Sequence, residues 1–399
     1  MKILYVNSDP GVPLYGSKGA SVHLRSMAGA LARAGHEVRV LSERLGPKPP
    51  MAGDGPAFRV GAFPAGHVDA LDPESAALRR NGDVREHLVC EALGWQPDFL
   101  YERYSLWGRA GVDAARMLGL PLVLEVNAPL VDEATLYRGL RHADDARRLA
   151  RHVFEHASVA LAVSSAVAGH VCSLGASPAR VRVMPNAVER GLFESLPPRV
   201  AGHGQAAGDT LTLGFCGGLR PWHGVSDLAR IFLRVRSTVP AVRLLVVGDG
   251  PARAELEQAM AAAGAADALE LTGAVGHAEV PAHLARMDVA LAPYPPLEPF
   301  YFSPLKLFEY QAAGLPVVAS RQGDLPEYVR HGETGFLYPP GHVEAASRMV
   351  LELHADRAMA ARVGAASRAG VLRDHTWDCR AAEVARIVME LASPRRVAS

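Results

Sequence analysis

The sequence predicts an α/β protein with two Rossmann-like, doubly wound domains. Three observations lead to this prediction. The chain has 399 residues, more than one hydrophobic core usually serves. Short apolar runs typical of buried strands alternate with amphipathic helical segments. The alternation occurs twice, on either side of a Pro/Gly-rich stretch at 197–208 that we expect to be the linker.

The first half contains apolar runs that we expect to form a parallel sheet. A helical segment follows the first run, with Val22, Leu24, Met27, Ala28 and Leu31 on one helical face. We therefore predict an N-terminal domain over residues 1–196. Its expected strands lie within 2–8, 36–42, 97–104, 121–127, 158–164 and 180–186.

The second half repeats this pattern and predicts a C-terminal domain over residues 209–375. Ligands of doubly wound sheets bind beyond the carboxyl ends of the strands, and we expect both domains to face a shared cleft. The helical pattern within 376–399 fits either domain. The expected strands of the second half lie within 211–217, 242–250, 268–275, 289–295 and 316–320.

Composition excludes several classes of protein. Lys plus Arg and Asp plus Glu number 42 each, so net charge gives no reason to expect nucleic acid as a partner. No apolar stretch reaches the roughly 18–20 residues of a membrane span, and the N-terminus resembles a strand rather than a signal peptide. We expect a cytoplasmic protein. The four cysteines lack zinc-site spacing, so we expect no metal site.

The stretch "SPLKLFEYQAAGLPVVAS" at 303–320 predicts a phosphate site. Ser303 and Pro304 suit the N-cap and first position of a helix, which puts Lys306 in the first turn. The helix dipole is already positive there, so a nearby anion is expected. Backbone N–H groups around Ser303 to Leu305, with the charge of Lys306, predict a diphosphate site. Glu309 fits either an ion pair with Lys306 or a hydrogen-bond acceptor for ribose hydroxyls.

Two glycine-rich loops are further candidates. Gly16 and Gly19 follow the first strand and suit close approach of a ligand, or a loop that binds nothing. They do not form the G-x-G-x-x-G fingerprint of a nicotinamide-dependent oxidoreductase. In "GFCGGLRPWHGVSDL", Arg220 and His223 also suit a phosphate. The alternative places Trp222 in the core and leaves Arg220 solvated.

These motifs resemble the family 4 retaining glycosyltransferases, which have the GT-B fold. The similarity runs over nearly the whole chain and is most specific in 303–320 and in "HGETGFLYPPG". The resemblance implies a nucleotide-sugar donor bound mainly by the C-terminal domain, and a C-terminal helix that crosses back onto the N-terminal one. It implies that Lys306 binds the diphosphate, that Glu309 binds the ribose and that Gly19 lines the leaving phosphate.

The sequence departs from the family pattern at three places. Tyr301 stands where a glutamate usually contacts the donor sugar, with Glu298 as an alternative. The usual arginine-plus-lysine diphosphate pair appears as Gly218 and His223, with Arg220 displaced by two residues. Asn127 occupies a position that is often a histidine beside the donor sugar.

The function that we expect is transfer of a sugar from a nucleotide-diphosphate donor to a hydroxyl acceptor. No D-x-D motif occurs, so a metal clamp is not indicated. The resemblance implies retention, and the departing phosphate then accepts the proton of the acceptor. We expect Lys306, Arg220 and Asn127 to serve catalysis. The alternatives are a sugar-nucleotide epimerase of the same fold and an inactive glycosyltransferase-like partner protein.

The acceptor class stays open among a small molecule, a polysaccharide and a lipid carrier. The segment 138–156 carries five arginines, which suits either peripheral contact with an anionic membrane or a solvated helix face. Asp144 and Asp145 interrupt the arginines and favour the solvated face.

Overall fold

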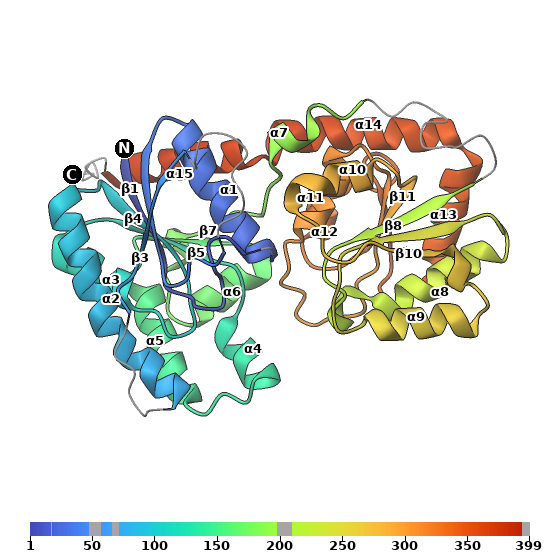
Figure 1. Cartoon of the computed structure of the whole chain (residues 1–399). Helices are drawn as coiled ribbons and strands as arrows, with labels where there is room; N and C mark the ends of the chain where they lie inside the picture. The colour runs from blue at the N-terminus through green and yellow to red at the C-terminus, as the bar shows by residue number, and fades with distance from the viewer. Residues whose placement is uncertain (17, 48–56, 66–71, 198–209, 393–399) are drawn as a thin grey trace. The chain divides into compact units, whose positions relative to one another are not determined.

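The chain folds as two units, each built on a parallel sheet (Figure 1). The computed structural model describes residues 1–16, 18–47, 57–65, 72–197 and 210–392. One unit comprises Met1–Pro185 together with Trp377–Ser399, and the other comprises Asn186–Thr376. Helices connect successive parallel strands in both units, so the predicted α/β class with two Rossmann-like domains is confirmed.

The described residues of the N-terminal unit form a seven-stranded parallel sheet in the order β3-β2-β1-β4-β5-β6-β7. The strand order reverses between β1 and β4, which makes their carboxyl ends the switch point where such sheets bind ligands. β5 and β6 are buried along their whole length, as in sheets covered on both faces. The strands are β1 (Lys2–Asn7), β2 (Glu37–Ser42), β3 (Arg59–Ala62), β4 (Phe99–Arg103), β5 (Leu122–Val126), β6 (Val159–Ala162) and β7 (Val181–Val183).

The helices of this unit include the C-terminal helix of the chain. α15 lies against α1, so it belongs to the N-terminal unit, as the resemblance implied (Figure 1). The five residues predicted to share one face of α1 are all buried. The helices are α1 (Gly19–Arg33), α2 (Pro73–Trp95), α3 (Ala110–Leu118), α4 (Leu130–Tyr137), α5 (Ala143–His156), α6 (Ser165–Ser173), the 3₁₀ turn η1 (Pro178–Arg180) and α15 (Trp377–Ala392).

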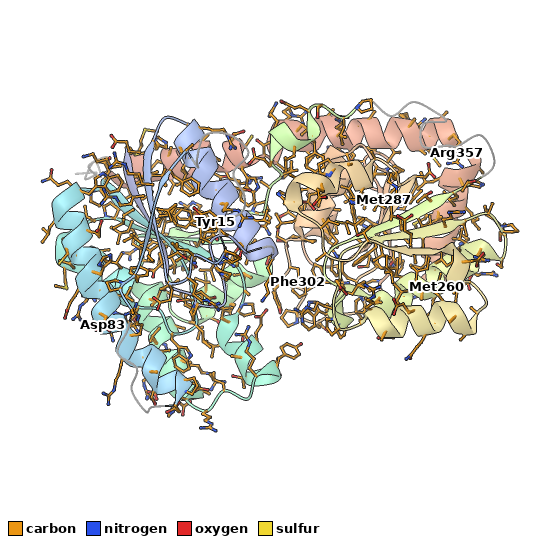
Figure 2. All side chains as sticks on the ribbon, in the orientation of Figure 1. Tyr15, Asp83, Met260, Met287, Phe302 and Arg357 are labelled. Carbon is orange, nitrogen blue, oxygen red and sulfur yellow. The ribbon has the colours of Figure 1, made fainter. Side chains whose placement is uncertain are left out.

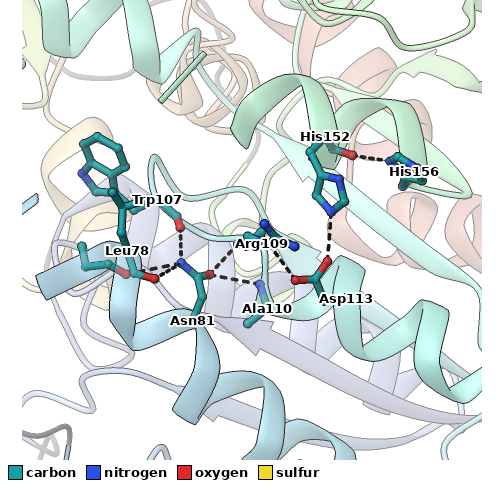
Figure 3. Close-up of polar contacts among 9 residues, drawn as sticks. Leu78, Asn81, Trp107, Arg109, Ala110, Asp113, His152 and His156 are labelled. Carbon is teal, nitrogen blue, oxygen red and sulfur yellow. Dashed lines mark hydrogen bonds and ion pairs between the residues drawn. The ribbon is translucent and has the colours of Figure 1, made fainter. Parts of the chain in front are cut away.

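Asn81 of α2 caps the neighbouring helix α3 (Figure 3). Its Oδ1 accepts hydrogen bonds from the backbone N–H groups of Arg109, at 2.7 Å, and Ala110, at 3.2 Å. Arg109, the N-cap residue of α3, makes no capping bond with its own side chain. Asn81 therefore does for α3 what an N-cap side chain usually does.

We expect Asn81→Ala to lower the free energy of unfolding by about 1–2 kcal/mol, because two N–H groups of α3 lose their acceptor. Urea unfolding of the full chain measures this change. The neighbouring Gly82→Ala is the control, since a Cβ at Gly82 meets nothing within 4 Å and alanine favours the helix. Equal stability of the two variants would contradict the capping role.

The C-terminal unit has, among its described residues, a six-stranded parallel sheet in the order β10-β9-β8-β11-β12-β13. The order reverses between β8 and β11, so the switch point lies at the carboxyl end of β8. Apolar residues from β8, β9 and the helices α8 and α9 fill one side of the sheet. The strands are β8 (Thr212–Cys216), β9 (Arg243–Val247), β10 (Leu269–Leu271), β11 (Val289–Ala292), β12 (Val317–Ser320) and β13 (Phe336–Tyr338).

The helices of the C-terminal unit vary from single turns to 18 residues. The 3₁₀ turns are η2 (Pro221–His223), η3 (Ala266–Ala268) and η4 (His277–Glu279). The α-helices are α7 (Arg190–Phe193), α8 (Val225–Arg236), α9 (Arg253–Ala262), α10 (Val280–Leu284), α11 (Leu305–Ala312), α12 (Leu325–Tyr328), α13 (Val343–Ala355) and α14 (Arg357–Asp374).

The predicted domain boundary at residue 196 needs correction, because the chain divides between Pro185 and Asn186. Residues 186–196 belong to the C-terminal unit, where Phe193 is fully buried in the core. The N–H of Val188 also donates to the carbonyl of His375, at 2.9 Å. The predicted linker at 197–208 lies, apart from its first residue, outside the described residues.

Candidate functional site

Lys306 lies in the first turn of α11 and is only 7% exposed. Its Nζ makes no hydrogen bond to any described residue, and it lies 4.0 Å from the ring centroid of Phe215 and 5.6 Å from that of Tyr294. Burial lowers the pKa of Lys306 to about 7, although Cys216 and Glu309 act in the opposite direction. A buried amine with aromatic neighbours and no carboxylate partner favours an anionic ligand.

The loop after β8 brings its backbone close to this amine. Gly217 has φ +128°, and a Cβ added there would lie 3.1 Å from Nζ of Lys306. The N–H of Gly217 donates to the carbonyl of Val247, at 2.8 Å, which ties the loop to β9. Glycine is therefore required where the β8 loop passes Lys306.

Tyr310 fixes α11 to the end of β8. Its buried hydroxyl accepts a hydrogen bond from the N–H of Cys216, at 2.6 Å. Tyr310 follows Lys306 by four residues and lies on the same side of α11. The sequence analysis missed this contact, which the helical spacing from Lys306 could have indicated.

The start of α11 differs from the prediction. Pro304 is the N-cap residue and Leu305 the first helical residue, so Ser303 is not the N-cap. The Oγ of Ser303 instead accepts the N–H of Asn186, at 3.0 Å, and its carbonyl accepts the side-chain amide of Asn186. Because its hydroxyl is used to hold residue 186, Ser303 positions the start of α11 without capping it.

His223 and Arg220 lie in very different surroundings. Burial, followed by the charge of Lys306, lowers the pKa of His223 to about 3, so the imidazole is neutral at pH 7. Its Nδ1 bonds to the carbonyl of Gly218 and therefore carries the proton, which makes Nε2 an acceptor. Arg220 is exposed, with its guanidinium 5.8 Å from the ring centroid of Trp222.

Glu309 makes an ion pair, but not with Lys306. Its Oε1 lies 2.9 Å from Nε2 of His277 in η4, a residue that the sequence analysis did not single out. The predicted alternative of a Lys306–Glu309 ion pair is therefore wrong. Glu309 is 8% exposed and projects from α11 one turn after Lys306.

An aromatic segment precedes α11. The rings of Tyr294 and Phe302 are nearly parallel at 6.4 Å, and Phe302, labelled in Figure 2, lies 4.4 Å from the ring of Tyr301. Tyr301 and Phe302 are half-buried, whereas Glu298 is exposed. The residues around the family's sugar-binding glutamate are thus mainly aromatic here.

Asn127 belongs to a polar cluster in the N-terminal unit. Its Nδ2 donates to Oε1 of Glu125, which also accepts Arg103, at 2.9 Å. Oε2 of Glu125 lies 2.8 Å from His23 Nε2 and 2.7 Å from the hydroxyl of Tyr101. Burial alone would raise the pKa of Glu125, but these partners hold it well below its ordinary value. Glu125 therefore accepts the amide hydrogens and leaves Oδ1 of Asn127 for other donors.

The two glycines of the first glycine-rich loop differ in their surroundings. Gly19 is the exposed first residue of α1. A Cβ at Gly16 would lie 2.5 Å from Oγ of Ser21, so packing within the loop is a sufficient reason for that glycine.

The structure thus gathers part of the predicted site. Gly218, His223, Lys306 and Glu309 lie around the carboxyl end of β8, beside Ser303, Pro304 and Leu305. Arg220 lies at an exposed margin, while Gly19 and Asn127 belong to the N-terminal unit. Within the described residues, no group of three or more His, Cys, Asp or Glu side chains could hold a metal ion.

Comparison with known proteins identifies the family. The model described as Glycosyltransferase Family 4 matches residues 17–191, and the model described as Glycosyl transferases group 1 matches residues 210–356. The chain belongs to family 4 of the glycosyltransferases, as its motifs predicted.

Two relatives and one solved structure show the extent of the similarity. A GDP-mannose-dependent alpha-(1-6)-phosphatidylinositol monomannoside mannosyltransferase of Mycobacterium tuberculosis is 30% identical over 60% of this chain, and the match spans only 64% of that relative. A glycogen synthase of the same species is 27% identical over 98% of this chain and 94% of its own length. The structure of HepE from Anabaena with UDP and glucose has a TM-score of 0.71 at 20% identity, over 98% of this chain and 99% of its own. The fold is therefore GT-B.

Proposed function

We propose that this protein transfers a sugar from a nucleotide-diphosphate donor to a hydroxyl acceptor, without a metal and with retention of anomeric configuration. The observation that carries the proposal is the buried amine of Lys306, which has no hydrogen-bond partner among the described residues and lies beside the glycine loop of β8. The relatives' names support such a donor: one uses GDP-mannose, and HepE holds UDP and glucose.

The negative charge that develops on the leaving diphosphate needs preorganised donors. Lys306 supplies one, and the backbone N–H groups of Leu305 and Lys306, which open α11 ahead of its first hydrogen bond from Leu307 to Pro304, supply others. Arg220 is exposed and able to turn toward the ligand, which gives it an auxiliary role. Nε2 of His223 becomes a hydrogen-bond donor only when the imidazole is protonated. A bound phosphate favours that protonation, so His223 donates through Nε2 only when phosphate is bound.

The acceptor hydroxyl must lose a proton as the new bond forms. We assign no protein nucleophile, and the departing phosphate takes this proton on the same face of the sugar. Oδ1 of Asn127 accepts hydrogen bonds but is too weak a base to take the proton. Asn127 therefore orients a substrate hydroxyl, and Gly19 allows the leaving phosphate to approach α1.

The donor also needs a ribose contact and a sugar contact. Glu309 is the acceptor for ribose hydroxyls, since its carboxylate lies one turn from Lys306. Tyr301 and Phe302 offer the sugar an aromatic surface where the family usually has a carboxylate. The base and the sugar of the donor stay open.

The test is a panel of UDP-, GDP-, TDP- and ADP-sugars, scored for nucleotide release and for thermal stabilisation by each free nucleotide. We expect one nucleotide to stabilise the protein. We expect the sugar conjugate of that nucleotide to be consumed faster when an acceptor is added. Conversion of the sugar without nucleotide release would favour the epimerase. Absence of stabilisation by any nucleotide would favour the inactive partner protein.

Donor binding should weaken as pH rises above 7, because deprotonation of Lys306 removes the charge that the diphosphate meets. A nucleotide sugar keeps its charge over pH 7–9, so its affinity should fall by up to about tenfold per pH unit. Titration calorimetry at several pH values measures this fall. The Lys306→Met variant should bind weakly and without this slope, whereas an equal slope in both proteins would refute the assignment.

Membrane contact through 138–156 has limited support. Arg147 and Arg148 of α5 pair with Asp144 and Asp145, and Arg138 lies 3.9 Å from Glu133. These ion pairs favour the solvated helix face. No helix in the described part of the chain has the length and apolar character of a membrane span.

A further inference from the structure

The pair formed by His277 and Glu309 suggests a role for a residue outside the predicted site. The side chain of Glu309 is 10% exposed, and its Oε1 lies 2.9 Å from Nε2 of His277. Among the described residues, His277 is the hydrogen-bond partner of the Glu309 carboxylate, and it contacts Oε1, so Oε2 has no partner there. One oxygen is thus held, and the other is available to a ligand.

The backbone around His277 is itself held in place. The antiparallel bridge between Gly248 and Gly273, with an N–H to carbonyl distance of 3.0 Å, ties the segment before η4 to the end of β9. The N–H of Gly276 donates to Oε2 of Glu279, at 2.8 Å, which closes the turn that carries His277. The backbone that carries His277 is therefore held by hydrogen bonds, and this limits the positions from which the imidazole contacts Glu309.

Fixing a carboxylate matters for recognition of a diol. A carboxylate accepts hydrogen bonds at two oxygens, and two adjacent hydroxyls meet both only if its plane is correctly turned. His277 takes one acceptor position of Oε1 and so fixes the rotation of the carboxylate about its last bond. A preoriented acceptor loses less entropy on binding than a freely rotating one.

We propose that His277 is a positioning residue that orients Glu309 toward the 2′- and 3′-hydroxyls of the ribose and makes the site selective for ribonucleotides over 2′-deoxyribonucleotides. This inference rests on the proposed function, since it requires a nucleoside diphosphate at Lys306. It adds a residue of η4 to a site otherwise built by β8 and α11.

The experiment compares the affinities of UDP, GDP and ADP with those of their 2′-deoxy counterparts. The proteins are the wild type, His277→Leu, His277→Gln and the control His342→Leu, which replaces an exposed histidine of the same unit. Thermal unfolding without ligand shows whether each variant is folded.

We expect the wild type to prefer the ribonucleotide by about tenfold, the effect of one hydrogen bond to a charged group. His277→Leu should lose about tenfold in affinity for the ribonucleotide, with little change for the deoxynucleotide, so that the preference nearly disappears. His277→Gln keeps an N–H donor and should retain most of the preference, and His342→Leu should behave as the wild type.

Two results would overturn the inference while leaving the proposed function intact. One is binding of ribo- and deoxyribonucleotides by the wild type with equal affinity. The other is an equal loss for both ligands in His277→Leu, which indicates a merely structural histidine. Failure of every nucleotide to bind the wild type would instead reject the proposed function, and this inference with it.

Discussion

Lys306→Met is expected to weaken nucleotide binding and to slow turnover strongly, while leaving the protein folded and more stable. The methionine fills the space of the lysine between Phe215 and Tyr294 without burying an amine. Removing one donor from a site of developing charge typically costs about 10²–10³ in rate, and we expect at least that here.

Lys306→Met is expected to weaken binding but to gain stability, and the pH dependence of unfolding tests the reason for this gain. Because the pKa of Lys306 is lower in the folded state, about 7, than in the unfolded chain, the unfolded chain binds more protons above pH 7. Wild-type stability should therefore rise with pH from about 7 toward the ordinary lysine pKa, by at most about 1.4 kcal/mol per unit from this group. Lys306→Met should lack this contribution.

Urea unfolding of both proteins at pH 7 and pH 9, beside nucleotide titrations, measures the two effects. The control is Lys2→Met, which alters a lysine of the first strand in the N-terminal unit. Normal nucleotide affinity in Lys306→Met would remove the central argument for the diphosphate site. If Lys306→Met were less stable than the wild type at pH 7, the claim that burial of the amine destabilises the folded protein would be contradicted.

Gly224→Ala is expected to destabilise the C-terminal unit by at least about 3 kcal/mol. Gly224 joins η2 to α8 with φ +73°, and a Cβ there would lie 1.6 Å from the carbonyl oxygen of Pro293. That oxygen belongs to the backbone, so relief of the clash requires a shift of the loop that follows β11. The shift would also disturb His223 and Tyr294, and hence the surroundings of Lys306.

The matched control is Gly370→Ala in α14, where a Cβ meets nothing within 4 Å and alanine favours the helix. Urea unfolding of the full chain should give a large loss for Gly224→Ala and no loss for Gly370→Ala. A loss below about 1 kcal/mol at Gly224 would mean that the loop after β11 yields easily.

Among the described strands, the sequence predicted all those in the interior of the two sheets, and both strands that it missed lie at a sheet edge. β5 and β6 are continuous apolar runs because helices cover both of their faces. β3 and β13 each lie at one edge of their sheet and have only four and three residues, whereas β7 and β10, at the opposite edges, were predicted. The pairing of β3 with β2 and of β13 with β12 reveals the two missed strands.

The sequence alone determined the family, the two α/β domains and the residue types of the proposed diphosphate site. These features follow from local patterns: apolar runs, glycines before helices, and a lysine in a first helical turn. A family motif also placed Glu309 one turn from Lys306, although the sequence could not say which partner its carboxylate would take.

Only the tertiary structure decided the partners of these residues. His277 is 32 positions before Glu309, and Asn186 is 117 before Ser303, yet each pair is in hydrogen-bonding contact. Phe215 meets Lys306 because α11 packs beneath the end of β8 through Tyr310. Such contacts depend on how crossovers bring distant segments to one sheet edge, and no periodicity of the sequence records that. Local sequence patterns therefore identified the side chains of the proposed site, and the packing of the C-terminal unit determined what each of them contacts.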